Sequence, residues 1–177
     1  MAGLATAWWL ARGGHRVTVV EREAAPGAHA TGRGAGLVRH LCPDPHLLEL
    51  GRLGAARLYA PPPELSARPL AERTGSVLLA GTRDGPRLAA AAVVARAAGL
   101  TVEVEEAGRD DDLMGVVPER DMLAISTPHD GLARPDVIVE TLVAACRRAG
   151  VRLRLGRDAH VRTSAGRVTA VALAGPD

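Results

Sequence analysis

Hydrophobic positions in the first part of the chain change from helical to strand-like spacing. Residues 3–12 are helix formers with almost no polar face, which predicts a helix buried on more than one side. Gly13 and Gly14 end that helix. The β-branched run at 16–21 has the pattern of a strand covered on both faces in a parallel sheet. Helix, glycine turn and buried strand together make two thirds of a βαβ unit.

The same alternation continues after a stretch of small residues. We interpret residues 22–42, in which glycines recur, as a functional loop and not as a regular element. Asp44, between two prolines, is the expected N-cap of a helix over 46–59. Further strands are predicted at 75–80, 101–105, 122–127, 151–155, 159–162 and 167–173, helices at 86–98 and 134–149, and turns at 110–112 and 164–166.

Composition excludes several classes of function. The chain has 177 residues, 22 basic and 20 acidic, so its net charge of +2 is too balanced to favour nucleic acid as a partner. A hydrophobic content of 47% is ample for a core in one domain or two small ones. Every basic residue is arginine, which rules out a Schiff-base lysine and the lysine of a P-loop.

The cysteines and the apolar segments indicate in which cellular compartment the protein is expected. Cys42 and Cys146 lie far apart with no CxxC motif, so neither a disulfide framework nor a cysteine-rich zinc site is implied. The apolar run at 4–11 is too short to cross a bilayer. A secretory signal has basic residues before its apolar run, and this chain has none there. We therefore expect a cytoplasmic protein without a transmembrane segment.

Two residues fit a dinucleotide-binding fold. Such a fold needs a glycine where its first helix packs closely on the sheet and an acid at the tip of the second strand. Gly3 and Glu21 can supply these groups, at nearly the spacing that the motif requires. These two features alone leave an alternative open, in which Gly3 is simply close to the terminus and Glu21 is the charged end of a strand.

A longer pattern resembles a known family. MAGLATAWWLAR at 1–12 and GHRVTVVER at 14–22 look like the start of the FAD-dependent oxidoreductases of the D-amino-acid oxidase, glycine oxidase and sarcosine oxidase superfamily. ATGRGAGLVR at 30–39 is similar to the flavin-contacting loop of that family. GSVLLA at 75–80, Asp130-Gly131 with Pro135, the segment 150–156 and GRVTAV at 166–171 follow in the family's order.

The resemblance implies an α/β fold and a division of the chain. It implies a partial Rossmann-like FAD-binding layer from 1–73 and 134–177, and a partial mixed or antiparallel substrate-side sheet from 74–133. The family opens with a strand and G-x-G-x-x-G, and Gly3 takes the place of the third glycine. We therefore expect a fragment of a longer flavoprotein that lacks the first strand and the C-terminal half.

The resemblance also assigns roles to residues. Leu4 and Ala5 would offer helix N-terminal amides to the pyrophosphate, and Glu21, with Arg22 beside it, would accept a hydrogen bond from the adenosine ribose. Small residues of the loop would surround the phosphates and approach the flavin, and Gly34 replaces a frequent Asn. The candidate cofactor-binding residues are Gly3, Leu4, Ala5, Glu21, Arg22, Thr31, Gly32, Arg33, Ala35, Gly36 and Ala159.

The implied activity is oxidation of an amino acid or amine by FAD, with hydride transfer from the carbon beside the amine to the flavin. No residue is nominated as catalytic, because the substrate contacts of the family would lie largely outside these residues. The chain alone is then expected to be inactive. Two alternatives stay open: a non-catalytic truncated or degenerate product, and a subunit whose partner completes the flavin site.

Three further clusters of polar residues each have a simple structural interpretation. His40, Cys42 and His46 form H-x-C-x3-H, but a fourth metal ligand is not evident, so ordinary loop residues are the better interpretation. The acidic residues 110–112 lack the alternation of a calcium loop and predict a solvated turn. His129 and Asp130 are expected to point to opposite faces of a strand, which argues against a dyad.

Overall fold

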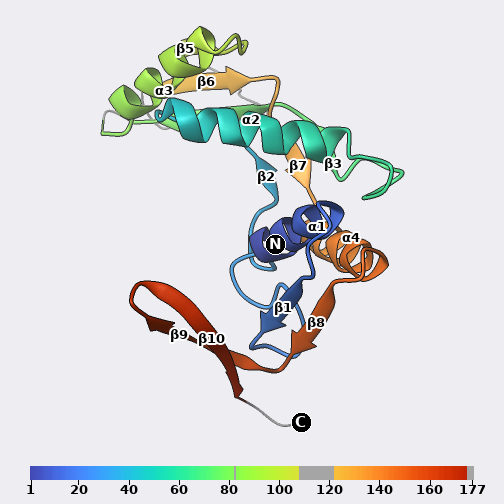
Figure 1. The fold of residues 1–177 in the computed structure, drawn as a ribbon. Coiled ribbons are helices and arrows are strands. Elements are labelled where there is room, and N and C mark those ends of the chain that lie inside the picture. Colours follow the sequence, from blue (N-terminus) through green and yellow to red (C-terminus); the bar gives the residue numbers. More distant parts are fainter. Residues whose placement is uncertain (82, 108–121, 175–177) are drawn as a thin grey trace. The chain divides into compact units, whose positions relative to one another are not determined.

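The computed structural model describes residues 1–81, 83–107 and 122–174, so the predicted turn at 110–112 lies outside the described residues (Figure 1). The chain forms two compact units. Unit 1 contains Met1–Ala35, Pro63–Ala67 and Arg134–Asp177, and unit 2 contains Gly36–Pro62 and Arg68–Ala133. Parallel and antiparallel sheets both occur, which confirms the predicted α/β class.

Unit 1 is built on a parallel strand pair and two helices. β1 (Thr18–Glu21) pairs in parallel with β8 (Arg152–Leu155), as the β-branched pattern at 16–21 predicted. α1 (Ala2–Arg12) packs against α4 (Pro135–Arg148). At this contact the buried Cys146 thiol donates a hydrogen bond to the carbonyl of the buried Leu4, at 3.3 Å. The described part of the chain contains no helix with the length and apolar character needed to span a bilayer.

The expected burial of α1 on more than one side is wrong. Leu4, Ala7 and Trp8 are buried on the face that meets α4. Trp9 and Leu10 remain 48% and 44% exposed. The composition of a helix reports which side chains could be buried, whereas the number of neighbouring elements decides which are. β1 is likewise only half-buried from Val19 to Glu21, and is not fully covered on both faces.

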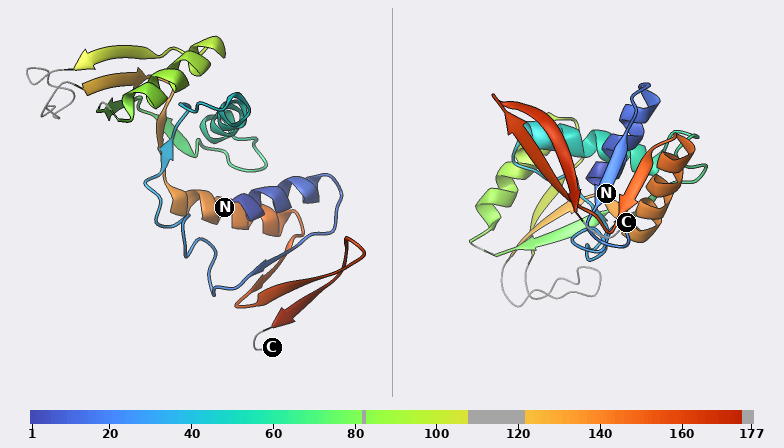
Figure 2. Two further views of the ribbon diagram at one scale, coloured as in Figure 1. Left: turned by 90° about the vertical axis from the view of Figure 1, so that its left-hand side faces the viewer. Right: turned by 60° about the horizontal axis from the view of Figure 1, so that its bottom comes forward.

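A long hairpin completes unit 1. β9 (Asp158–Ser164) and β10 (Arg167–Ala174) are antiparallel, with Ser164 opposite Arg167. Ala165 and Gly166 between them both have positive φ, of 48° and 72°, which is the backbone of a two-residue hairpin turn and confirms the turn predicted at 164–166. Figure 2 draws this hairpin in red as two long strands. Its apolar side chains are largely exposed.

Unit 2 has a sheet with one face covered by helices. β4 (Ser76–Ala80), β6 (Met122–Thr127) and β5 (Glu103–Ala107) are antiparallel in the order β4-β6-β5, and α3 (Gly85–Ala97) packs on β6 and β5. β5 begins two residues later than predicted, because the Thr101 amide donates to His129 Nε2 and the Val102 carbonyl accepts from Arg96 Nε. The buried core consists of Leu48, Ala92, Ala95, Val102 and Ile125.

α2 (Pro45–Tyr59) begins where the sequence predicts. The Asp44 carboxylate accepts the amides of His46 at 2.8 Å and Leu47 at 3.1 Å, which are two of the amides that a helix leaves without an internal partner. Pro45 occupies the first helical turn, where no amide hydrogen is needed.

Unit 2 contains a second sheet that was not predicted from the sequence. β2 (Leu37–Val38), β7 (Gly131–Ala133) and β3 (Ala71–Arg73) are antiparallel in the order β2-β7-β3. β2 falls within 22–42, all of which we expected to be loop. Strands of two or three residues carry no readable alternation, and their pairing joins segments far apart in the sequence.

Candidate functional site

The amino end of α1 presents unpaired backbone donors. The Ala5 amide donates to the Met1 carbonyl at 3.0 Å, and no side chain of the described residues caps the helix. The amides of the first turn, Gly3 and Leu4 among them, have no acceptor within a helix. These donors and the helix dipole favour an anion at this end. A Cβ at Gly3 would meet no described atom within 4 Å, so the close packing expected to require this glycine is not observed.

The predicted flavin-contacting loop is folded tightly on itself. Gly27 has φ of 88°, and its carbonyl accepts the Gly32 amide at 2.9 Å. The Arg33 amide donates to the His29 carbonyl at 3.2 Å. A Cβ at position 32 would lie closer to the Gly27 carbonyl oxygen than real Cβ contacts ever do, so this position requires glycine. Gly27 itself lies against the Val139 side chain of α4.

Other predicted residues of this loop lie on the surface. The Thr31 hydroxyl accepts a hydrogen bond from the Met1 amino group at 3.4 Å, which brings the loop beside the amino end of α1. Arg33 is exposed, and its guanidinium forms no ion pair with the described residues. Ala35 is also exposed. Gly36 belongs to unit 2, where it has φ of 72° and its carbonyl accepts the Ala133 amide at 2.7 Å.

Glu21 ends β1 as predicted, at a corner of the chain. Its Oε1 accepts the Glu23 amide at 3.0 Å, and its main-chain carbonyl accepts the Arg157 amide at 3.0 Å. Two residues beyond Arg157, Ala159 lies exposed on β9 opposite Leu173. The structure therefore brings Glu21 close to the chain that leads to Ala159.

Arg22 pairs with a residue that the sequence analysis did not single out. Its Nε lies 3.4 Å from Glu23 Oε1, and His29 Nε2 lies 2.7 Å from the same oxygen. The hydrogen bond from His29, with help from Arg22, lowers the pKa of the Glu23 carboxyl. All three groups are solvent-exposed to a large extent, so their pairing orients the loop more than it stabilises the fold.

Unit 2 contains a buried polar cluster around Asp130. Its Oδ1 accepts the His40 amide at 2.8 Å and faces His40 Nδ1 at 2.9 Å. Its Oδ2 accepts the hydroxyls of Ser76 and Thr127, each at 2.7 Å. Burial favours the neutral acid, but the hydrogen bonds from His40, Ser76 and Thr127 together hold the pKa of Asp130 below its usual value. Asp130 therefore stays ionised although only 2% of it is exposed.

The cluster around Asp130 corrects the expectation that His129 and Asp130 lie on a strand, and it also involves a residue of the H-x-C-x3-H pattern. His129 and Asp130 lie in a turn after β6, not on a strand, and the partner of Asp130 is His40, 90 residues away in the sequence. No local signal could have paired them. His40, one member of the H-x-C-x3-H pattern, is thus engaged with a carboxylate. Within the described residues, no group of three potential ligands could hold a metal ion.

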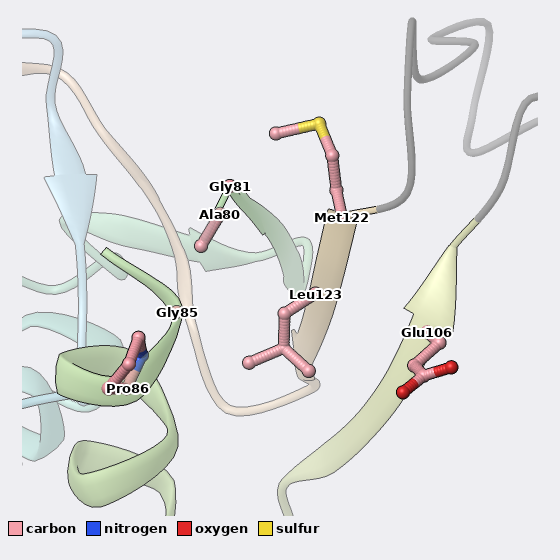
Figure 3. Close-up of a pocket in the computed structure, with 7 residues that line it drawn as sticks. All are labelled: Ala80, Gly81, Gly85, Pro86, Glu106, Met122 and Leu123. Carbon is pink, nitrogen blue, oxygen red and sulfur yellow. The ribbon is translucent and has the colours of Figure 1, made fainter. Parts of the chain in front are cut away.

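A pocket of about 250 Å³ lies in unit 2 (Figure 3). It is smaller than most cofactor pockets. Among the described residues that line it, Glu106 of β5 has the only charged side chain, and Figure 3 shows Met122 and Leu123 leaving β6 in different directions. The lining residues are Ala80, Gly81, Gly85, Pro86, Glu106, Met122 and Leu123. None is a candidate cofactor-binding residue.

Comparison with known proteins identifies the family. The model of a family described as FAD dependent oxidoreductase matches residues 1–176. No curated protein sequence matches the chain. Among solved structures, an L-amino acid deaminase from Proteus myxofaciens is 18% identical with a TM-score of 0.73, and covers 96% of this chain. A glycine oxidase from Bacillus cereus is 20% identical with a TM-score of 0.71, also over 96%.

An L-proline dehydrogenase from P. horikoshii is 17% identical with a TM-score of 0.71 over 96% of this chain. At these identities the likeness shows a shared fold. The chain spans 39%, 48% and 46% of the lengths of the deaminase, the glycine oxidase and the dehydrogenase, respectively. The match to the family model covers almost every residue, so the chain belongs to the family of FAD dependent oxidoreductases.

Proposed function

We propose that unit 1 binds FAD through the amino end of α1, the glycine loop and the Glu21 corner. The observation that carries this proposal is the closed turn from Gly27 to Gly32, which lies beside the uncapped amides of α1. The proposed cofactor residues are the unit 1 residues predicted from the sequence: Gly3, Leu4, Ala5, Glu21, Arg22, Thr31, Gly32, Arg33, Ala35 and Ala159. Gly36, which follows Ala35 directly in the chain, belongs to unit 2 and stays a prediction from the sequence.

The donors and acceptors of these residues fit the parts of FAD. The pyrophosphate is anionic, and the first-turn amides of α1 and the exposed Arg33 guanidinium offer hydrogen bonds and positive charge. A ribose offers hydroxyl donors, and Glu21 Oε2 has no hydrogen-bond donor among the described residues. Arg22 would lie beside the ribose, while Ala159 would meet the adenine through its backbone.

We further propose that the complete enzyme oxidises an amino acid or an amine. The deaminase, the glycine oxidase and the dehydrogenase are each named for an amino acid or a class of amino acids. When bound, the flavin accepts a hydride from the carbon beside the substrate amine. The residues proposed here bind and orient the cofactor, and none of them is assigned to the substrate.

A functional division of the chain follows from this proposal. Residues 1–73 and 134–177 would form the FAD-binding part, and 74–133, which contain β4-β6-β5, would form the substrate-side sheet. The compact units have other boundaries, because 36–62 and 68–73 pack with unit 2. We also propose a reducing compartment such as the cytoplasm, since Cys42 and Cys146 are free thiols.

A second candidate is a chain that needs a partner to complete the flavin site, or that has no catalytic role. β1 and β8 form a sheet of only two parallel strands within the described residues. Parallel sheets normally have more strands and helices on both faces. The chain also spans less than half the length of its structural neighbours. A further polypeptide that pairs with β1 or β8 would supply what such a sheet lacks.

Visible absorbance and thermal unfolding with and without FAD test the proposal. A bound flavin gives a visible spectrum, and FAD at 100 times its Kd should stabilise the chain by about 2.7 kcal/mol. Glu21→Ala should weaken FAD binding, whereas Glu140→Ala, a matched exposed carboxylate on α4, should not. A folded wild-type chain that binds no FAD would favour the second candidate. Equal FAD affinity in both variants would remove the ribose role of Glu21.

A further inference from the structure

We propose that Glu23 is a positioning residue of the FAD site in unit 1: its main chain fixes the corner at Glu21, and its carboxylate holds the closed turn Gly27–Gly32 to that corner through His29. This inference rests on the proposed function, because it assumes that the corner and the turn contact the cofactor. Glu23 is not one of the proposed cofactor residues, so its role would be exerted through Glu21 and His29. All of these residues belong to unit 1.

The first step of the argument is that the main chain of Glu23 fixes the corner. Its amide donates to Glu21 Oε1 at 3.0 Å, which leaves Oε2 available to a ribose hydroxyl. Its carbonyl accepts the Gly156 amide at 3.0 Å, and Gly156 has φ of 66°, a conformation that favours glycine. The next amide, of Arg157, donates to the Glu21 carbonyl at 3.0 Å. Glu23 therefore ties the end of β1 to the connection between β8 and β9.

The second step is that the side chain of Glu23 reaches the closed turn. His29 Nε2 donates to Glu23 Oε1 at 2.7 Å. His29 lies within Gly27–Gly32, and its own carbonyl accepts the Arg33 amide at 3.2 Å. The carboxylate is therefore bonded to the residue whose main chain also restrains Arg33. One residue thus contacts both the corner and the turn, which are the two parts of unit 1 proposed to bind the ribose and the phosphates.

The third step concerns charge, because Glu23 and FAD are both anionic. Arg22 Nε lies 3.4 Å from Glu23 Oε1, and the hydrogen bond from His29 lowers the pKa of the Glu23 carboxyl. Glu23 is thus ionised at neutral pH. A carboxylate that acted only through its charge would repel the pyrophosphate, so its removal would tighten FAD binding. Removal of a carboxylate that positions the turn would weaken binding. The sign of the change therefore separates the two roles.

The experiment compares the FAD affinity of variants of the 177-residue chain at a temperature where urea unfolding shows each of them to be folded. Glu23→Ala removes the acceptor of His29 and should weaken FAD binding by about three- to fivefold, which corresponds to the upper range for exposed ion pairs. Glu23→Gln removes the charge but keeps an oxygen that can accept from His29. Its FAD affinity should return to within about twofold of the wild type.

His29 supplies the second half of the test. His29→Ala removes the donor to Glu23 and should weaken FAD binding to the same extent as Glu23→Ala. Because the two variants break one contact, the double variant should bind FAD about as tightly as either single variant. Glu140→Ala and His15→Ala are the controls, at exposed residues of unit 1 that form no ion pair with the described residues. Both should bind FAD like the wild type.

The outcomes separate this inference from the proposed function. If the folded wild type binds no FAD, the proposed function fails and the inference falls with it. If the wild type binds FAD and Glu23→Ala binds it equally well or more tightly, only the inference is overturned. It is also overturned if Glu23→Ala weakens binding but His29→Ala does not, since the effect then runs through Arg22. Losses that multiply in the double variant would show that Glu23 and His29 act independently, and would overturn it as well.

Discussion

The amide of Gly32 donates to the carbonyl of Gly27 at 2.9 Å, and this approach leaves no room for a side chain at position 32. Gly32→Ala forces the turn to open, because the obstacle is backbone and cannot move aside as a side chain could. We expect a loss of stability of about 1–3 kcal/mol, the range for strained backbone sites. Urea unfolding and FAD affinity measure the effect on the fold and on the proposed site.

Gly34→Ala is the control for that prediction. A Cβ at position 34 would lie 3.5 Å from the Ala30 carbonyl oxygen and 3.6 Å from that of Thr31, which are ordinary contacts. This variant should unfold within about 0.5 kcal/mol of the wild type. If both alanine variants behave alike, the closed turn does not exist as described.

The N-cap of α2 gives a second prediction. Asp44→Ala removes the acceptor of the His46 and Leu47 amides and should cost about 1 kcal/mol. Asp84→Ala, at the equivalent position of α3, removes no side-chain cap and should cost much less. Denaturation midpoints in urea compare the two. A larger loss from Asp84→Ala would contradict the assignment of these caps.

Acid unfolding tests the ionised state of Asp130. Its pKa is lower in the folded chain than in the unfolded chain, so the folded state binds this proton less readily. Its contribution to stability is therefore present above the ordinary pKa of an aspartate, about 3.9, and is lost as the pH falls through the lower folded value. The difference in unfolding free energy between wild type and Asp130→Asn should be constant near neutral pH and shrink below about pH 4.

A difference that stays constant down to about pH 2 would mean that Asp130 does not titrate in this way. Asp84→Asn provides the reference, because that carboxylate is exposed and caps no helix amide.

The two thiols should differ in reactivity. Cys146 is buried between α1 and α4, and burial raises the pKa of its thiol. The thiolate is the reactive form, so the native chain should react with iodoacetamide at Cys42, which is partly exposed, well before Cys146. Peptide mass mapping measures both rates. In denaturant the rates should converge, and equal rates in the native chain would disprove the packing of α1 on α4.

The sequence predicted most of the long elements because their signals are local. Asp44 with Pro45 marks the start of α2, and the β-branched run ending at Glu21 predicted a strand in a parallel pair. The short strands β2, β3 and β7 were missed because only their partners define them. The exposure of Trp9 was missed for a related reason: composition shows that a side chain is apolar, but not whether a neighbour covers it.

Some features of the candidate site could likewise be predicted from the sequence, and others could not. The glycine loop and Glu21 were visible as a motif, and the proposed roles of these residues remain predictions. The bond from His40 to Asp130 spans 90 residues, so no window of sequence contains both partners. The reason for Gly32 could not be foreseen either, since the sequence shows a glycine but not the carbonyl that excludes a side chain.

The discontinuity of unit 1 has a consequence for synthesis on the ribosome. Leu4 of α1 meets Cys146 of α4 across 142 residues of chain. At about 5–20 residues per second, that separation corresponds to roughly 7 to 28 seconds of translation. During this interval the apolar face of α1 has emerged but its cover has not been made. The nascent chain therefore exposes this apolar face until α4 has been synthesised, and a chaperone that shields apolar surface would act during that interval.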